Sequence, residues 1–157
     1  MASRPMENPY LRIEGYNCFG CSPRNPYGLH MQFVHDEEAS EVYALVSPAP
    51  EHCGYPGVLH GGIQATLLDE VGYWAVHQKL EAPAFTTRLD IELLKAVRIP
   101  ATLELRARVI ETRRKLVTVE ARLLVYTVEH ARARITYYLA DSRVWEKVTG
   151  LPAAELC

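Results

Sequence analysis

The chain has 157 residues, of which 48% are hydrophobic and 23% charged, and its formal net charge at neutral pH is −2. These values predict one soluble globular domain over residues 1–157, and they lack the basic character of a nucleic-acid-binding domain. Because no run of about 18 apolar residues and no signal-peptide layout is present, we expect no membrane partner and a cytoplasmic location.

The first third of the chain predicts an irregular segment, a hairpin and a loop. Residues 1–27 are rich in Pro, Asn and Gly, which favours irregular structure. Apolar and polar residues then alternate over 29–34 and again over 42–46, with a turn at 36–38, as expected for a hairpin. Residues 48–62 are too dense in Gly and Pro for regular structure and predict a loop.

The strongest helical pattern follows this loop. Four apolar residues recur at helical spacing: Ile63, Leu67, Val71 and Trp74. We expect a helix from about Gly61 to Gln78, which Pro83 prevents from continuing much further.

The second half of the chain alternates between apolar and polar residues in four runs, at 85–94, 103–109, 117–123 and 131–145. Each run has one apolar and one polar face, as in an antiparallel sheet that is covered on one side. The single helix is the natural cover. The sequence therefore predicts an α+β fold, in which a curved antiparallel sheet wraps around one long helix.

The start of the helix is the most informative place for chemistry. Gly61 and Gly62 allow a ligand to approach the backbone closely, and the first N–H groups of a helix have no partner within it. Together with the helix dipole, such a site suits an oxyanion or a polarised carbonyl. The alternative is that the two glycines only turn the chain into the helix.

Asp69 favours the chemical interpretation. Three of its neighbours one turn away are small (Ala65, Thr66 and Gly72), which leaves room for a ligand or another chain. Glu70 fits better as a solvated acid on the outer face. Asp69 lies about 12 Å along the helix from Gly61, too far for both to act on one carbonyl carbon. A shared substrate therefore requires two antiparallel copies of the helix, and so a homodimer.

Two segments resemble a known family. Residues 54–70, which contain His60-Gly61-Gly62 and Asp69, closely resemble the PaaI-like hotdog-fold thioesterases, as do 17–21 and 25–29. The resemblance implies a hotdog fold, acyl-CoA or acyl carrier protein thioesters as substrates, and no metal or cofactor apart from the CoA of the substrate. It also implies homodimers that join two sheets side by side and often pair into homotetramers.

The resemblance implies a role for several residues. Gly61 matches the glycine whose N–H polarises the thioester carbonyl, and Asp69 the acid that activates water or attacks the carbonyl. His60 matches the motif histidine that holds the loop and the thioester end. Some members carry an earlier Asn as a further donor. The corresponding position here is Gly54. Either the nearby His52 serves instead, or the oxyanion hole rests mainly on the Gly61 amide.

A Ser or Thr on the next strand often orients the water or the acid in this family. Counting along the motif favours Thr86, whereas strand parity places Thr87 toward the helix and Thr86 on the other face with Arg88. Thr86 ranks first and Thr87 second. Further substrate-binding candidates are Gly62, Tyr73 and Arg88, the last for CoA phosphates.

Cys18 and Cys21 could form half of a zinc site, with His30 or Cys53 completing it. Because no second Cys-x-x-Cys pair is present, we expect a reduced pair that shapes the N-terminal loop, and no metal.

The predicted function is hydrolysis of acyl-CoA thioesters by Gly61 of one subunit and Asp69 of the other. One alternative is a hotdog enoyl-thioester hydratase or dehydratase, which the spacing of His60-Gly61-Gly62 and Asp69 disfavours. The other is a non-catalytic acyl-CoA-binding module, which would have no use for Asp69. Acyl specificity depends on how Tyr73, Trp74 and Tyr137 pack.

Overall fold

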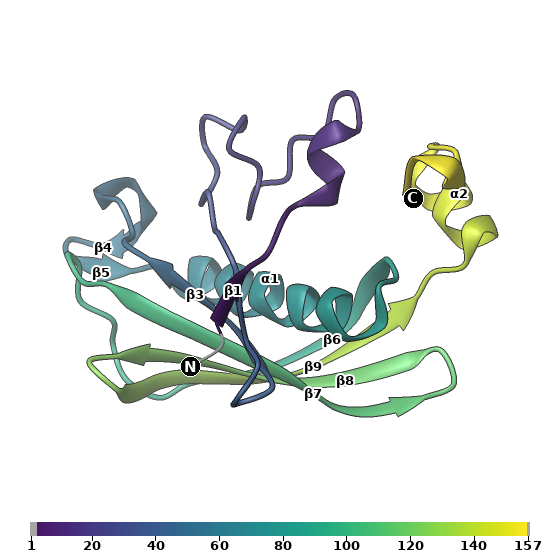
Figure 1. Ribbon diagram of the computed structural model, residues 1–157. Helices are drawn as coiled ribbons and strands as arrows, with labels where there is room; N and C mark the ends of the chain where they lie inside the picture. Colours follow the sequence, from purple (N-terminus) through teal and green to yellow (C-terminus); the bar gives the residue numbers. More distant parts are fainter. Residues whose placement is uncertain (1–2, 157) are drawn as a thin grey trace.

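The computed structural model describes residues 3–156, in which a curved sheet of seven strands lies against one long helix (Figure 1). All neighbouring strands are antiparallel. Their order across the sheet is β1 (Ser3–Pro5), β2 (Val34–Asp36), β3 (Glu41–Val46), β7 (Leu103–Arg113), β8 (Leu116–Val125), β9 (Val128–Leu139) and β6 (Ala84–Leu93). The predicted α+β class and the sheet around one central helix are confirmed.

The central helix α1 spans Gly61–Leu80, so its predicted start is confirmed. It ends where Glu81 adopts a left-handed conformation, with φ of 49°, two residues before Pro83. Leu67, Val71 and Trp74 of its apolar stripe are at most 1% exposed. Burial of each such side chain stabilises the fold by about 1.5–3 kcal/mol. Within residues 3–156, no helix is both long and apolar enough to cross a membrane.

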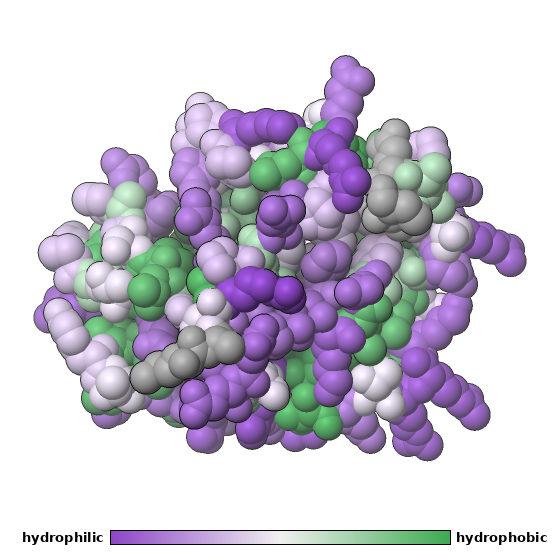
Figure 2. Space-filling model, viewed as in Figure 1, coloured by the Kyte–Doolittle hydropathy of each residue, from purple (hydrophilic) through white to green (hydrophobic). Residues whose placement is uncertain are grey.

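The sheet turns its apolar face to α1 and its charged face outward. Leu105, Val119 and Ile135 occupy neighbouring strands and are fully buried. The residues next to them along the strands point to the other face and include the charged Arg106, Glu120 and Arg134. On the side of the molecule seen in Figure 2, hydrophilic residues dominate and hydrophobic ones form separate patches. The alternation expected from the sequence therefore corresponds to the two faces of the sheet.

The first sixty residues are more regular than expected. The segment 1–27 contains β1 and a short 3-10 helix, η1 (Pro9–Arg12). The predicted loop contains the 3-10 helix η2 (Pro50–His52) and a small hairpin of β4 (Cys53–Tyr55) and β5 (Val58–Leu59). The hairpin forms because Gly57, with φ of 71°, tolerates the left-handed turn between its strands.

The prediction of a strand over 29–34 is largely wrong. Leu29, Met31 and Phe33 are buried, but strand pairing begins only at Val34. Alternating burial thus occurs here in a segment that packs on the core without joining the sheet.

The last predicted strand is too long. Strand β9 ends at Leu139, and a short helix, α2 (Ser142–Thr149), follows, then a 3-10 helix, η3 (Ala153–Leu156). The carboxylate of Asp141 caps α2 by accepting the N–H of Val144 at 2.9 Å, which favours a helix over a continued strand. Trp145 of α2 stacks on Tyr10 of η1.

Candidate active site

The start of α1 leaves one backbone donor free. The Nδ1 of His60 accepts the N–H of Gly62 at 2.8 Å, and the His60 carbonyl accepts those of Ile63 and Gln64. Within residues 3–156, the N–H of Gly61 has no hydrogen-bond acceptor. The imidazole of His60 therefore caps the Gly62 amide in the first turn of the helix. The adjacent Gly61 amide has no such partner and is available to a ligand.

This amide borders a cavity of about 520 Å³ between the hairpin, the helix start and the end of β6. A Cβ atom on Gly61 would lie 3.1 Å from Cδ1 of Leu93, so a side chain at this position would crowd the cavity. The lining residues are Gly54, Tyr55, Val58, Leu59, His60, Gly61, Gln64, Leu93, Leu94, Lys95 and Ala96. The mainly apolar lining beside one free donor suits an acyl group with a carbonyl.

Asp69 lies further along α1 and is held by two hydroxyl groups. Thr86 of β6 donates to its Oδ1 at 2.8 Å. The hydroxyl of Tyr137 on β9 lies 3.1 Å from the same oxygen and 2.7 Å from the Asp69 carbonyl oxygen. Burial raises the pKa of Asp69 above its usual value, and the hydrogen bonds from Thr86 and Tyr137 oppose this rise.

Tyr137 is a site residue that the sequence analysis did not assign to Asp69. A Cβ atom on Gly72 would lie 2.4 Å from the Tyr137 hydroxyl, so the missing side chain is what lets this hydroxyl reach the helix. The small residues beside Asp69 were expected to leave room for a ligand or another chain. Tyr137 of the same chain partly fills that room. The signal was available, because Tyr137 is on the predicted inward face of its strand beside a helix of small residues.

The prediction that Thr87 faces the helix and Thr86 the outer face of the sheet is wrong. A β-bulge between Thr86 and Arg88 shifts the register, so that Thr86 pairs with Tyr137 and Arg88 with Thr136. Thr86 consequently faces the helix, and Thr87 donates instead to the carbonyl of Thr136 at 3.0 Å. Strict alternation fails here because a bulge adds one residue to one strand, so the side chains beyond it point to the opposite face of the sheet from the one that alternation predicts.

The other substrate-binding candidates, His52, Tyr73 and Arg88, neither line the cavity beside Gly61 nor hydrogen-bond the Asp69 carboxylate. His52 accepts the N–H of Ala49 through Nδ1 at 3.1 Å and the N–H of His60 through its carbonyl at 2.9 Å, so it holds the loop. The hydroxyl of Tyr73 hydrogen-bonds that of Tyr10. Arg88 pairs with Asp90 at 2.8 Å on the outer face of the sheet, which separates it from Asp69.

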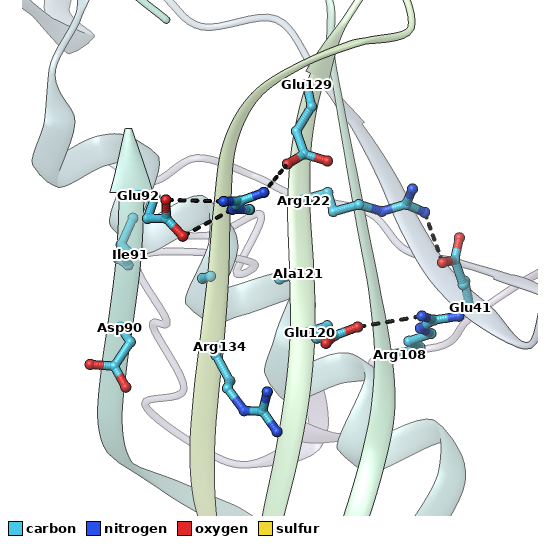
Figure 3. Close-up of a pocket in the computed structure, with 12 residues that line it drawn as sticks. Glu41, Asp90, Ile91, Glu92, Arg108, Glu120, Ala121, Arg122, Glu129 and Arg134 are labelled. Atoms are coloured by element: carbon cyan, nitrogen blue, oxygen red, sulfur yellow. Dashed lines mark hydrogen bonds and ion pairs between the residues drawn. The ribbon is translucent and has the colours of Figure 1, made fainter. Parts of the chain in front are cut away.

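That outer face carries a hollow of about 730 Å³ (Figure 3). Ion pairs cross it, including Arg132 with Glu92 at 3.0 Å and Arg122 with Glu41 at 2.8 Å. The lining contains none of the residues of the helix start or of the Asp69 group. Paired charges of both signs leave little net attraction for an anionic ligand, so this hollow does not compete with the cavity beside Gly61.

Glu70 is not the solvated acid that the sequence predicted. It accepts the indole N–H of Trp74 at 3.2 Å, and the Cys18 thiol lies 3.6 Å from its Oε1. Burial raises the pKa of Glu70 to about 7. Glu70, Cys18 and Cys21 place their possible ligand atoms within 4.8 Å of one another. The alternative of a zinc site completed by His30 or Cys53 is not formed: neither residue belongs to this group, and the ring of His30 hydrogen-bonds the Asn25 carbonyl.

Comparison with known proteins finds similarity to one family. Residues 56–127, which include the helix start, Asp69 and Thr86, match the model of the thioesterase superfamily. No curated protein matches the chain.

Solved structures share the fold. An X-ray structure of a thioesterase-superfamily protein is 28% identical, with a TM-score of 0.67 over 76% of this chain and 90% of that one. Another member has a TM-score of 0.69 at 17% identity, over 76% of this chain and only 58% of that one. A hypothetical thioesterase from Streptococcus pneumoniae, solved with coenzyme A, is 20% identical, with a TM-score of 0.60 over 64% of this chain and 81% of that one.

These similarities show the hotdog fold of solved thioesterase-superfamily structures. Residues 56–127 of the chain are similar to the thioesterase superfamily.

Proposed function

We propose that the protein hydrolyses acyl-CoA thioesters, as a PaaI-like member of the superfamily. The observation that carries the proposal is the carboxylate of Asp69, which Thr86 and Tyr137 hold in a partly buried position on the helix that begins with the free Gly61 N–H. A carboxylate that is desolvated and oriented in this way is a competent base or nucleophile.

The reaction uses groups of the chain and of the substrate, with no further cofactor. The Gly61 N–H donates to the thioester carbonyl oxygen and stabilises the negative charge that forms there. Asp69 takes a proton from a water molecule while the water oxygen bonds to the carbonyl carbon. The C–S bond then breaks, and the protonated Asp69 returns its proton to the departing CoA thiolate. The alternative is direct attack by Asp69, which forms a mixed anhydride that water then hydrolyses.

One copy of the chain cannot supply both groups to one carbonyl, because Gly61 and Asp69 are about 12 Å apart along α1. Strand β6 offers a way to join two copies. Within residues 3–156 it pairs only with β9, which leaves one edge free, and its Leu89 and Leu93 are 40% and 52% exposed. A long, free, apolar edge is a template for another strand.

The positions along β6 fit this dimer. Thr86 lies beside Asp69, and Leu93 lies beside Gly61. If two β6 strands pair antiparallel about a two-fold axis near Asp90, Leu93 of each approaches Thr86 of its partner. The helix start of one subunit is thereby brought toward Asp69 of the other, twice per homodimer.

The comparisons support the substrate class. The family model covers both groups, and the Streptococcus pneumoniae protein was solved with coenzyme A. An acyl-CoA is therefore the substrate to test first.

The first test is release of free thiol from short, medium, long and aromatic acyl-CoAs. We expect the wild type to release CoA, and Asp69→Asn, which keeps the size of the side chain, to lose at least 100-fold in kcat. Glu38→Gln, a change in an exposed turn, is the matched control and should behave as wild type. Binding of acyl-CoA without release would indicate the binding module, and addition of water to enoyl-CoA the hydratase.

Complementation tests the dimer. Gly61→Pro removes the proposed donor at the first helical position, where proline is accepted, and His60 already has the extended ψ of 135° that precedes proline. Gly61→Pro and Asp69→Asn should each be inactive alone. Equal co-expression should restore about a quarter of wild-type activity, since half of random dimers are mixed and each has one intact site. No recovery in mixed dimers would contradict a shared site.

A further inference from the structure

The N-terminal segment folds directly onto the middle of α1, at a place separate from the proposed active site. The carbonyl of Cys18 accepts the N–H of Ser22 at 3.1 Å, which closes a tight turn around Cys-x-x-Cys. The neighbouring backbone is also fixed, because Met31 donates to the carbonyl of Gly20 at 2.9 Å. A Cβ atom on Gly20 would lie 2.4 Å from the Glu70 carboxyl carbon, so a side chain here would push the carboxylate away from the turn.

The turn aims two sulfur atoms at one carboxylate. The Sγ of Cys18 lies 3.6 Å from Oε1 and 3.8 Å from Oε2 of Glu70. With Zn–S near 2.3 Å and Zn–O near 2.1 Å, the sulfur–oxygen edge of a tetrahedral zinc site is about 3.6 Å. The sulfur of Cys21 belongs to the same group, in which the three possible ligand atoms lie within 4.8 Å of one another. A small shift of the Cys21 side chain would bring all three onto one ion.

The charges in this group also favour a cation. Among the ion pairs within residues 3–156, none involves Glu70, and its partners are the Trp74 indole and the weakly donating Cys18 thiol. A carboxylate largely removed from water is costly without a counter-charge. A divalent ion would supply that charge and use both sulfur atoms as strong ligands.

We infer that Cys18, Cys21 and Glu70 bind a thiophilic divalent metal ion, with Zn²⁺ the natural occupant, and that the ion fastens the N-terminal loop to α1. Binding bonds the metal to two sulfurs and one carboxylate oxygen, and the two thiol protons pass to solvent. No fourth Cys, His, Asp or Glu of residues 3–156 joins the group, so water takes the fourth position. This site is independent of the proposed hydrolysis and assigns a role to the cysteine pair.

The first experiment uses the full chain purified under reducing conditions without chelators. We expect about one zinc per chain by elemental analysis. Titration of the reduced, metal-stripped protein with Co²⁺ should produce thiolate-to-cobalt absorption and the strong visible bands of tetrahedral cobalt. Cys18→Ser and Cys21→Ser should lose both. Cys53→Ser is the matched control, because Cys53 lies on β4 outside the group, and it should keep both.

A second variant keeps the test decisive if the serine variants fold poorly. Glu70→Gln preserves the volume and removes one anionic ligand, so we expect it to fold and to bind Co²⁺ at least tenfold more weakly. Stripping the metal should lower the thermal midpoint of the wild type more than that of Glu70→Gln, because the weaker binding of the variant stabilises it less. Full-length protein that binds no Co²⁺ while its thiols are free, or that holds Cys18 and Cys21 as a disulfide after reducing purification, would overturn the metal site.

Discussion

Replacement of Thr86 by valine removes one hydrogen bond from Asp69 and changes little else, because the two side chains have the same shape. The Thr86 hydroxyl donates to Oδ1 of Asp69 at 2.8 Å. A hydrogen bond to a charged group contributes about 1.5–3 kcal/mol, and the partly exposed position favours the lower end. About 1.4 kcal/mol corresponds to a factor of ten, so we expect kcat/KM for acyl-CoA to fall about tenfold at neutral pH.

The pH dependence distinguishes this effect from a general loss of packing. Burial already raises the pKa of Asp69, and the Thr86 hydrogen bond lowers it. The active form is the carboxylate, so activity declines as the pH falls through this pKa. In Thr86→Val the acidic limb of the kcat/KM profile should therefore move to higher pH. Thr87→Val is the control, since Thr87 donates to the Thr136 carbonyl, and its limb should stay in place. An unmoved limb in Thr86→Val would refute the hydrogen-bond argument.

Two further changes test the contact between β9 and α1. Tyr137→Phe leaves the ring in place and removes the hydroxyl, so we expect activity to fall about tenfold and the free energy of unfolding by about 1 kcal/mol, measured by denaturant titration. Unchanged activity would show that this hydroxyl does not orient Asp69. Gly72→Ala places a Cβ atom 2.4 Å from the Tyr137 hydroxyl and should destabilise the wild type by about 1–3 kcal/mol, but much less in Tyr137→Phe. Equal costs in both backgrounds would argue against this contact.

The fold could be predicted where one physical signal dominates. The apolar stripe of α1 and the alternation of β7 and β8 each reflect burial on one face, and this pattern is visible in the residues themselves. The errors occur where side chains are buried but the backbone is not paired in the sheet. Leu29, Met31 and Phe33 alternate like a strand because they fill the core, although strand pairing begins only at Val34.

The candidate site was predictable at its helix and less so at its partners. Gly61 and Asp69 share one element, and their separation follows from helical rise alone. The neighbours of Asp69 depend on a bulge at Thr86 and on a contact between Gly72 and Tyr137, which are far apart in the chain. Alternation carries no mark of a bulge, and helical periodicity does not say which strand residue reaches a given turn.

Glu70 shows a further limit of what helical periodicity can predict. Successive helix residues point about 100° apart. Asp69 therefore faces β6, whereas Glu70 faces the N-terminal loop that contains Cys18. No periodic pattern in the sequence reveals how this loop packs. One helical turn thus carries both the proposed catalytic acid and the proposed metal ligand. The two roles separate experimentally: Asp69→Asn should abolish hydrolysis and keep the metal, while Glu70→Gln should weaken metal binding. Failure of either hypothesis would leave the other standing.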